Sequence, residues 1–263
     1  MHTKKVKMEA FGRLLDIMDA LREKCPWNAE QTMESIRPLT EEEVYELSDA
    51  ILKNEPEAVC KEIGDLLYHL VFYARIAQEK GLFDIADSLE KVCGKMIFRH
   101  PHVFGNSNGR TPSAKEIADT WELVKAKEKG GNKTVMAGIP DAMPAVLKAL
   151  SMQEKARGCG FDWEKPEDVW DKVREELEEA REACVGKDAA HREEEFGDLL
   201  FAVINASRLY GTDPEAALSK ACDKFRRRFG YLEENTLKRG IDLGSLTLAQ
   251  MDAIWDEAKA KGL

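Results

Sequence analysis

The sequence lacks several features that would assign it to a common class of protein. No run approaches the roughly 18 apolar residues that a membrane helix needs, and no apolar block of a signal peptide follows Met1. No segment sustains the alternation of apolar and polar side chains that marks a half-buried strand. The six cysteines form no Cys-x-x-Cys pair, so we expect reduced core thiols in a cytoplasmic protein.

An excess of basic charge is also missing. The chain has 49 acidic against 39 basic residues, a formal net charge of −10, which argues against nucleic acid or an anionic membrane as a partner. A small anionic ligand held by local cations or by a metal ion remains compatible with this balance. Charged residues make up 33% of the chain and hydrophobic ones 43%, which is typical of a helical globular protein.

Apolar side chains recur at helical spacing through most of the chain. In the first half this spacing predicts helices over about 9–23, 40–53, 56–78, 85–98 and 113–129. Thr40 is expected to cap the second of these, because Glu43 three residues later would complete a capping box. Glycine, asparagine and proline gather in 130–144, which we predict to be a linker between domains at 1–129 and 145–263.

The second half of the chain repeats the first. Glu43, Glu46, Glu62, Gly64 and Asp65 recur 133 positions later as Glu176, Glu179, Glu195, Gly197 and Asp198. Arg75 and Arg208 are separated by the same interval, and Lys91, Cys93, Lys95 and Arg99 match Lys220, Cys222, Lys224 and Arg228 after a four-residue contraction. So many matches in register predict an all-α fold of two tandem homologous helical bundles.

The repeated acidic residues have the spacing of a metal site. Glu43 and Glu46 are three residues apart on one helix face, as are Glu62 and Asp65 on the next helix. If the two helices pack antiparallel, the pairs face each other, and such carboxylates repel one another unless a cation lies among them. An all-oxygen site suits Mg²⁺ or Mn²⁺, whereas the thiolate and imidazole ligands of zinc are missing.

The acidic residues have two other interpretations. A solvated helix face is the ordinary explanation of one acidic run, but the duplication and the adjoining apolar Leu66-Leu67 and Leu199-Leu200 argue against it. A di-iron carboxylate site would need Glu-x-x-His on two helices. His69 follows Asp65 by four residues but has Ala202 as its counterpart, so a buried, hydrogen-bonded histidine is expected there.

Basic and aromatic residues accompany each acidic set. Lys91, Lys95 and Arg99 form a stripe at spacing four, as do Lys220, Lys224 and Arg228. Such cations suit phosphoryl chemistry, in which charge develops on several oxygens at once. Trp121 and Trp255, near the end of each half, would stack a base or anchor a core.

The doubled Glu-Glu-x-x-Glu and Glu-x-x-Asp motifs resemble those of the MazG family of all-α nucleoside triphosphate pyrophosphohydrolases. Cys25-Pro26-Trp27, Arg99-His100-Pro101-His102-Val103-Phe104 and Gly160-Phe161-Asp162-Trp163 extend the resemblance over the whole chain. The resemblance implies bundles that dimerise so that two subunits complete each site. It also implies Mg²⁺-dependent hydrolysis of nucleoside triphosphates, with deoxynucleotides as further candidates, to monophosphate and pyrophosphate.

The resemblance also implies roles for particular residues. The implied metal ligands are Glu43, Glu46, Glu62 and Asp65 in the first half and Glu176, Glu179, Glu195 and Asp198 in the second. The second-half set, with Lys224 and Arg228, would be catalytic. The implied nucleotide contacts are Lys172, Glu175, His191, Arg192, Glu193, Glu194, Lys224, Arg227, Arg228 and Trp255.

Two functional hypotheses follow. The first is the pyrophosphohydrolase, with most of the activity in the second half because of Lys172 and Arg227. The second is a non-catalytic helical module that binds nucleotides or a protein partner in a regulatory role. The base and sugar preference, the number of metal ions per site and the identity of any general base do not follow from the sequence.

Overall fold

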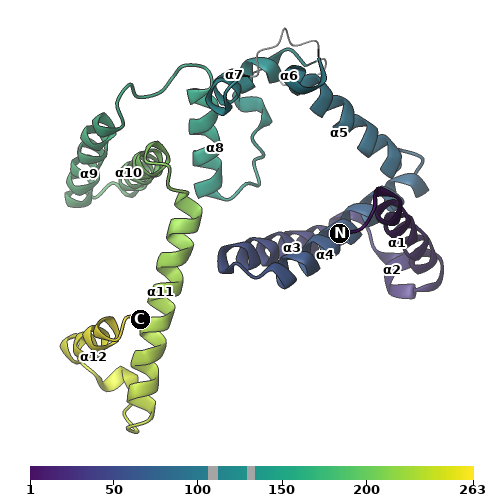
Figure 1. Ribbon diagram of the computed structural model, residues 1–263. Coiled ribbons are helices and arrows are strands. Elements are labelled where there is room, and N and C mark those ends of the chain that lie inside the picture. The colour runs from purple at the N-terminus through teal and green to yellow at the C-terminus, as the bar shows by residue number, and fades with distance from the viewer. Residues whose placement is uncertain (106–111, 129–133) are drawn as a thin grey trace. The chain divides into compact units, whose positions relative to one another are not determined.

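The computed structural model describes residues 1–105, 112–128 and 134–263, and the secondary structure of this part is helical throughout, without a strand (Figure 1). The predicted all-α class is therefore confirmed. None of the helices in these ranges is both long and apolar enough to cross a membrane. The chain divides into two compact units, Met1–Thr111 and Pro112–Leu263.

Within residues 1–105, the first unit contains six helices. They are α1 (Lys4–Lys24), α2 (Pro26–Glu30), α3 (Met33–Lys53), α4 (Pro56–Glu79), α5 (Ile85–Arg99) and α6 (Pro101–Phe104). Helices α3 and α4 pack against each other across a two-residue connection, so they run antiparallel as expected. The core lies where α1 and α3 meet α4 and is built from Met18, Ile36, Val71, Phe72 and Ile76.

The start of α3 differs from the prediction, since Thr40 lies inside the helix. Thr32 is the N-cap: its hydroxyl accepts from the Ser35 N–H at 3.2 Å, and the Ser35 hydroxyl accepts from the Thr32 N–H at 2.9 Å. The helix continues through Pro38, whose missing N–H removes one backbone hydrogen bond. The capping box and the burial of Ile36 outweigh that loss.

The second unit begins with α7 (Ala114–Ala126), whose Trp121 matches Trp255 of the last helix. It continues with η1 (Met136–Gly138), α8 (Ala145–Arg157), η2 (Pro166–Asp168), α9 (Val169–Val185), α10 (Ala189–Leu209), α11 (Pro214–Leu237), η3 (Leu243–Ser245) and α12 (Leu248–Ala260). Helices α9 and α10 form the second antiparallel pair, and α8 packs on α10 and α11. The unit begins at Pro112, ahead of the predicted linker at 130–144, of which 130–133 lie outside the described residues.

The thiols are not in the core. All six cysteines are free, and only Cys25 is partly buried. Cys60, Cys93, Cys184 and Cys222 are exposed because they lie on the solvent-facing sides of their helices. The prediction of core thiols is therefore wrong, although the prediction of unpaired cysteines holds.

An arginine at the matching position anchors the second helix of each pair. The Arg208 side chain, 6% exposed, donates from Nη1 to Asp162 Oδ2 at 3.0 Å and from Nε to Asn205 Oδ1 at 3.0 Å. Its counterpart Arg75 lies 2.8 Å from Asp19 on α1. The Gly160-Phe161-Asp162-Trp163 segment thus has a structural role, since its carboxylate fixes the loop before α9 to α10.

This anchor gives a stability prediction. Replacing Arg208 by methionine is expected to lower the free energy of unfolding of the second unit by about 3 kcal/mol, because Asp162 loses the partner that compensates its partial burial. Urea denaturation measures the change. Arg226→Met, which removes an 82% exposed arginine paired with Asp223, is the matched control and should cost under about 1 kcal/mol. Equal losses in the two variants would contradict the role assigned to Arg208.

Candidate metal and nucleotide site

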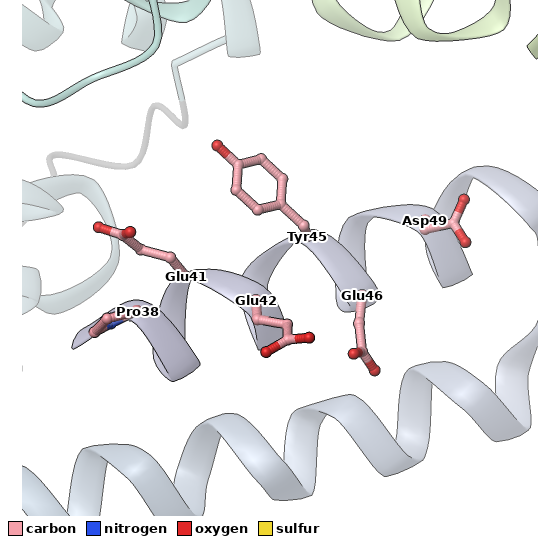
Figure 2. A pocket seen from close by; sticks show the side chains of 6 residues that line it. All are labelled: Pro38, Glu41, Glu42, Tyr45, Glu46 and Asp49. Carbon is pink, nitrogen blue, oxygen red and sulfur yellow. The ribbon is translucent and has the colours of Figure 1, made fainter. Parts of the chain in front are cut away.

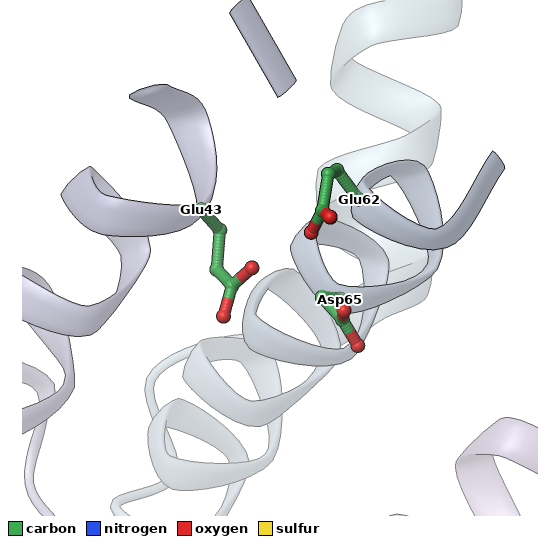
Figure 3. Close-up of side chains that lie close together, drawn as sticks. All are labelled: Glu43, Glu62 and Asp65. Atoms are coloured by element: carbon green, nitrogen blue, oxygen red, sulfur yellow. The ribbon is translucent and has the colours of Figure 1, made fainter. Parts of the chain in front are cut away.

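Three carboxylates of the first unit meet between α3 and α4 (Figure 3). Glu43 extends from α3 toward α4, which carries Glu62 and Asp65. One oxygen from each lies within 4.8 Å of the others. Glu62 is buried, whereas Glu43 and Asp65 are partly exposed. We call this set the first cluster.

The second unit contains the corresponding arrangement. Glu176 and Glu179 of α9 and Glu195 of α10 place one oxygen each within 4.8 Å of one another. Glu176 is buried, Glu195 is partly buried and Glu179 is exposed. We call this set the second cluster. The two clusters share the positions Glu43/Glu176 and Glu62/Glu195. On each helix this residue is more buried than the other predicted ligand of the same helix.

In each half one of the four predicted ligands lies outside the cluster, and the two omitted residues are not at equivalent positions. In the first half Glu46 stands apart, on the open acidic surface of α3 that Glu41, Glu42 and Asp49 also line (Figure 2). In the second half Asp198 stands apart and is exposed. Each half therefore gathers three of its four predicted ligands.

The electrostatics of both clusters fit a cation. Burial, followed by repulsion from neighbouring carboxylates, raises the pKa of Glu43. The same two causes raise the pKa of Glu179. Glu43 Oε2 is buried and has no hydrogen-bond partner. Carboxylate oxygens that repel one another, one of them buried without a protein partner, are a set that Mg²⁺ or Mn²⁺ would hold together.

A lysine contacts each cluster, from a different position. In the first half Lys61 Nζ lies 2.9 Å from Glu62, 3.4 Å from Asp65 and 3.8 Å from Glu46. In the second half Lys172 Nζ lies 2.9 Å from Glu175 and 2.6 Å from Glu176. Hydrogen bonds to these carboxylates raise the pKa of both lysines.

Lys61 is the site residue that the sequence interpretation missed. Lys172 stands out in the sequence because its counterpart is Leu39, and Lys61 differs from its own counterpart, Glu194, by a reversal of charge. The charge reversal at this pair was the signal that would have found it.

The residues of α10 that are predicted to contact the nucleotide have side chains in different surroundings. His191 Nδ1 lies 3.4 Å from Glu195 Oε1, which places this ring at the edge of the second cluster. Arg192 instead donates to the Gly186 carbonyl at 3.3 Å, in the connection before α10. Glu193 and Glu194 are exposed.

The predicted basic residues of α11 separate into two groups. Lys220, Lys224 and Arg227 line one shallow, open pocket. Arg228 turns to α12, where its Nε donates to the Leu263 carbonyl at 2.7 Å and its guanidinium lies 5.8 Å from the Trp255 ring centre. Trp255 also packs on Phe225 at 5.1 Å between ring centres, so in this structure it joins α11 to α12.

His69 does not belong to the first cluster. It is buried, as expected, but its Nδ1 has no hydrogen-bond partner, so the expected hydrogen bonding is incomplete. Burial lowers its pKa, which favours the neutral ring. The di-iron alternative lacks support, because both groups of ligating side chains found in the described residues consist of carboxylates.

Comparison with known proteins agrees with this arrangement. The model of the MazG nucleotide pyrophosphohydrolase domain matches twice, over residues 31–104 and 164–231. The chain is 45% identical over 252 residues to a nucleoside triphosphate pyrophosphohydrolase/pyrophosphatase MazG of Thermotoga maritima, covering 95% of each chain. It is 41% identical over 261 residues to a nucleoside triphosphate pyrophosphohydrolase of Escherichia coli K12, covering 96% of this chain and 98% of the relative.

A solved structure of a mazG-related protein from Thermotoga maritima covers 44% of this chain and 99% of its own, with 30% identity and a TM-score of 0.39. The helical fold, the two carboxylate clusters and the two family matches define an enzyme of the nucleotide pyrophosphohydrolase class. The chain belongs to the MazG nucleotide pyrophosphohydrolase domain family, with two copies of the domain in tandem. The predicted duplication and family are confirmed, and the non-catalytic alternative is set aside.

Proposed function

We propose that the protein hydrolyses nucleoside triphosphates, deoxynucleotides included, between the α and β phosphates in a Mg²⁺-dependent reaction that yields monophosphate and pyrophosphate. The observation that carries the proposal is the three-carboxylate cluster, formed twice between antiparallel helices. The unpartnered buried oxygen of Glu43 supports a cation there. The names of the Thermotoga and Escherichia relatives support the substrate class.

Metal ligation would fall to the acidic positions of both halves. Glu43, Glu62 and Asp65 would hold an ion in the first half, and Glu176, Glu179 and Glu195 in the second, with Glu46 and Asp198 completing each set. A bound Mg²⁺ or Mn²⁺ supplies charge neutralisation for the phosphates and a water of lowered pKa. The number of ions at each cluster stays open.

The chain's own cations would bind the polyphosphate. Lys224, Arg227 and Arg228 of α11 can neutralise the charge that develops on the leaving pyrophosphate. Arg228 would have to exchange its bond to the Leu263 carbonyl for one to a phosphate. Lys172 and Glu175, at the border of the second cluster, would position the triphosphate, and Trp255 would stack the base.

The second half is the main catalytic half in this proposal. Among the ion pairs of the described residues, Lys172 binds Glu175 and Glu176, and no lysine pairs with Glu179 or Glu195. Arg227 adds a cation to its basic stripe. The first half offers Leu39 in place of Lys172 and has Lys61 bound to its carboxylates.

Self-association is part of the proposal, because a repeated apolar face is exposed in each unit. Ile63, Leu67 and Leu70 of α4 are 48%, 39% and 53% exposed, and Phe196, Leu200 and Val203 occupy the same positions on α10 with 47%, 62% and 45% exposed. Apolar patches of this kind are typical of interfaces. A homodimer would cover these faces and bring the helices of a second copy to each cluster.

The dimer has a direct test. Light scattering coupled to size exclusion is expected to give about twice the 29.7 kDa of the chain. Replacing Leu67 and Leu200 together by glutamate should lower the mass toward that of one chain, while Leu82→Glu and Leu248→Glu, at exposed leucines outside these faces, should not. A wild-type mass of one chain would contradict the assembly.

The reaction is tested by resolving products. Purified protein is incubated with Mg²⁺ and each common nucleoside triphosphate, and the nucleotides are separated by anion exchange. Monophosphate and pyrophosphate are expected. Diphosphate with orthophosphate would contradict the cleavage position, and absence of turnover with every nucleotide would contradict the activity.

A cytoplasmic location is proposed as well, since six unpaired cysteines suit a reducing compartment.

A further inference from the structure

The ammonium group of Lys61 lies among the carboxylates of the first half. It contacts both oxygens of Glu62, at 2.9 and 3.1 Å, and reaches Asp65 at 3.4 Å on the same helix. It also reaches Glu46 of α3 at 3.8 Å, so it bridges the two helices. Lys61 thus contacts three of the four predicted ligands, and the fourth, Glu43, is the one whose buried Oε2 has no partner.

The second half has the opposite charge at this position. Glu194 stands where the first half has Lys61, immediately before the ligand position Glu195, and it is exposed. Lys172 does not replace Lys61, because it approaches from the preceding turn of α9 and binds Glu175 and Glu176. Glu179 and Glu195 therefore keep oxygens that no lysine contacts among the ion pairs of the described residues.

We propose that Lys61 is a tethered cation that competes with the divalent ion in the first half, so that the two halves of one chain differ in metal affinity. The inference rests on the proposed metal dependence and adds the residue that sets the difference. A divalent ion entering the first cluster must displace the ammonium group from Glu62 and Asp65. The Lys61 side chain is 63% exposed, so it can move out into water without leaving a buried charge unpaired.

Competition predicts a specific change in affinity. Removing the positive charge at position 61 should tighten binding of a divalent ion, whereas a lysine that merely orders the carboxylates would make binding weaker when removed. Because the group is exposed and screened by solvent, we expect a change of about tenfold rather than the far larger effect of a buried charge.

The experiment measures Mn²⁺ binding to the full-length chain by loss of the free Mn²⁺ electron paramagnetic resonance signal. Glu179→Gln and Asp198→Asn are introduced together so that only the first half can bind. In this background Lys61→Gln is compared with Lys61→Arg, which keeps the charge. Lys53→Gln is the matched control, because Lys53 pairs with Asp49 on α3, two helical turns beyond Glu46, and its loss changes the net charge equally.

Lys61→Gln is expected to bind Mn²⁺ about tenfold more tightly, with Lys61→Arg and Lys53→Gln within about twofold of the background. Weaker binding in Lys61→Gln, or the same gain in Lys53→Gln, would overturn the inference. A reverse background carries Glu46→Gln and Asp65→Asn, so that only the second half can bind. If this background binds Mn²⁺ while the first half binds none, with or without Lys61, the inference is also overturned. Absence of binding in both backgrounds would instead overturn the proposed metal dependence itself.

Discussion

Replacing Glu179 by glutamine and Asp198 by asparagine together is expected to lower kcat/KM for nucleoside triphosphate hydrolysis by about 100-fold or more. Glutamine and asparagine keep the volume of the side chains but remove the charge that holds the ion. Glu179 belongs to the second cluster, where burial and repulsion from the neighbouring carboxylates raise its pKa. Steady-state kinetics at saturating concentrations of Mg²⁺ measures the loss of kcat/KM.

The matched control is the same pair of changes in the first half, Glu46→Gln with Asp65→Asn. Its loss is expected to stay below about tenfold, because Lys61 already occupies these carboxylates and the first half lacks a counterpart of Lys172. Circular dichroism of both variants checks that the helices persist. Equal losses in the two double variants would contradict the assignment of the activity to the second half.

Removal of divalent ions is the second change with a large expected effect. Dialysis against EDTA should reduce turnover to the uncatalysed background, and Mg²⁺ or Mn²⁺ should restore it, because the clusters have no other cation that activates water. The ion should also stabilise the fold, since carboxylates that repel one another become ligands. At a free concentration of 100 times its dissociation constant, it would add about 2.7 kcal/mol to the free energy of unfolding.

Thermal denaturation with and without Mg²⁺ supplies the second readout. We expect the melting temperature to rise by several degrees with Mg²⁺ and to respond less in the Glu179→Gln/Asp198→Asn variant. Calcium chloride at equal ionic strength serves as a control for screening, because Ca²⁺ prefers more ligands than either cluster gathers. Turnover that survives exhaustive chelation would contradict the metal-based mechanism.

The sequence predicts the helices and the meeting of three acidic residues in each half, because both depend on short-range periodicity. Glu43 and Glu62 sit at the same helical register as Glu176 and Glu195, so antiparallel packing brings each pair together. Capping is harder to predict, since Thr32 and Thr40 both precede a polar residue by three positions. The choice of Thr32 depends on burying Ile36 beside Phe72, which is a contact between distant parts of the chain.

Contacts over long sequence distances explain the other differences. Asp162 belongs to a recognisable motif, but its partner Arg208 is 46 residues away, and the pair becomes visible only when α10 packs beside the loop before α9. Arg228 shares a helical stripe with Lys224, yet it binds the Leu263 carbonyl and faces Trp255. The charge reversal between Lys61 and Glu194 marks this position in the sequence, but the contact between Lys61 and Glu46 depends on how α3 packs on α4.

The central proposal is that water attacks the α-phosphorus and pyrophosphate leaves, and one experiment tests it most directly. The protein hydrolyses ATP with Mg²⁺ in water enriched in ¹⁸O, and ³¹P NMR resolves the products. We predict AMP carrying one ¹⁸O on its phosphorus together with unlabelled pyrophosphate. Labelled pyrophosphate with unlabelled AMP would place the attack on the β-phosphorus, and ADP with labelled orthophosphate would contradict the proposed reaction altogether.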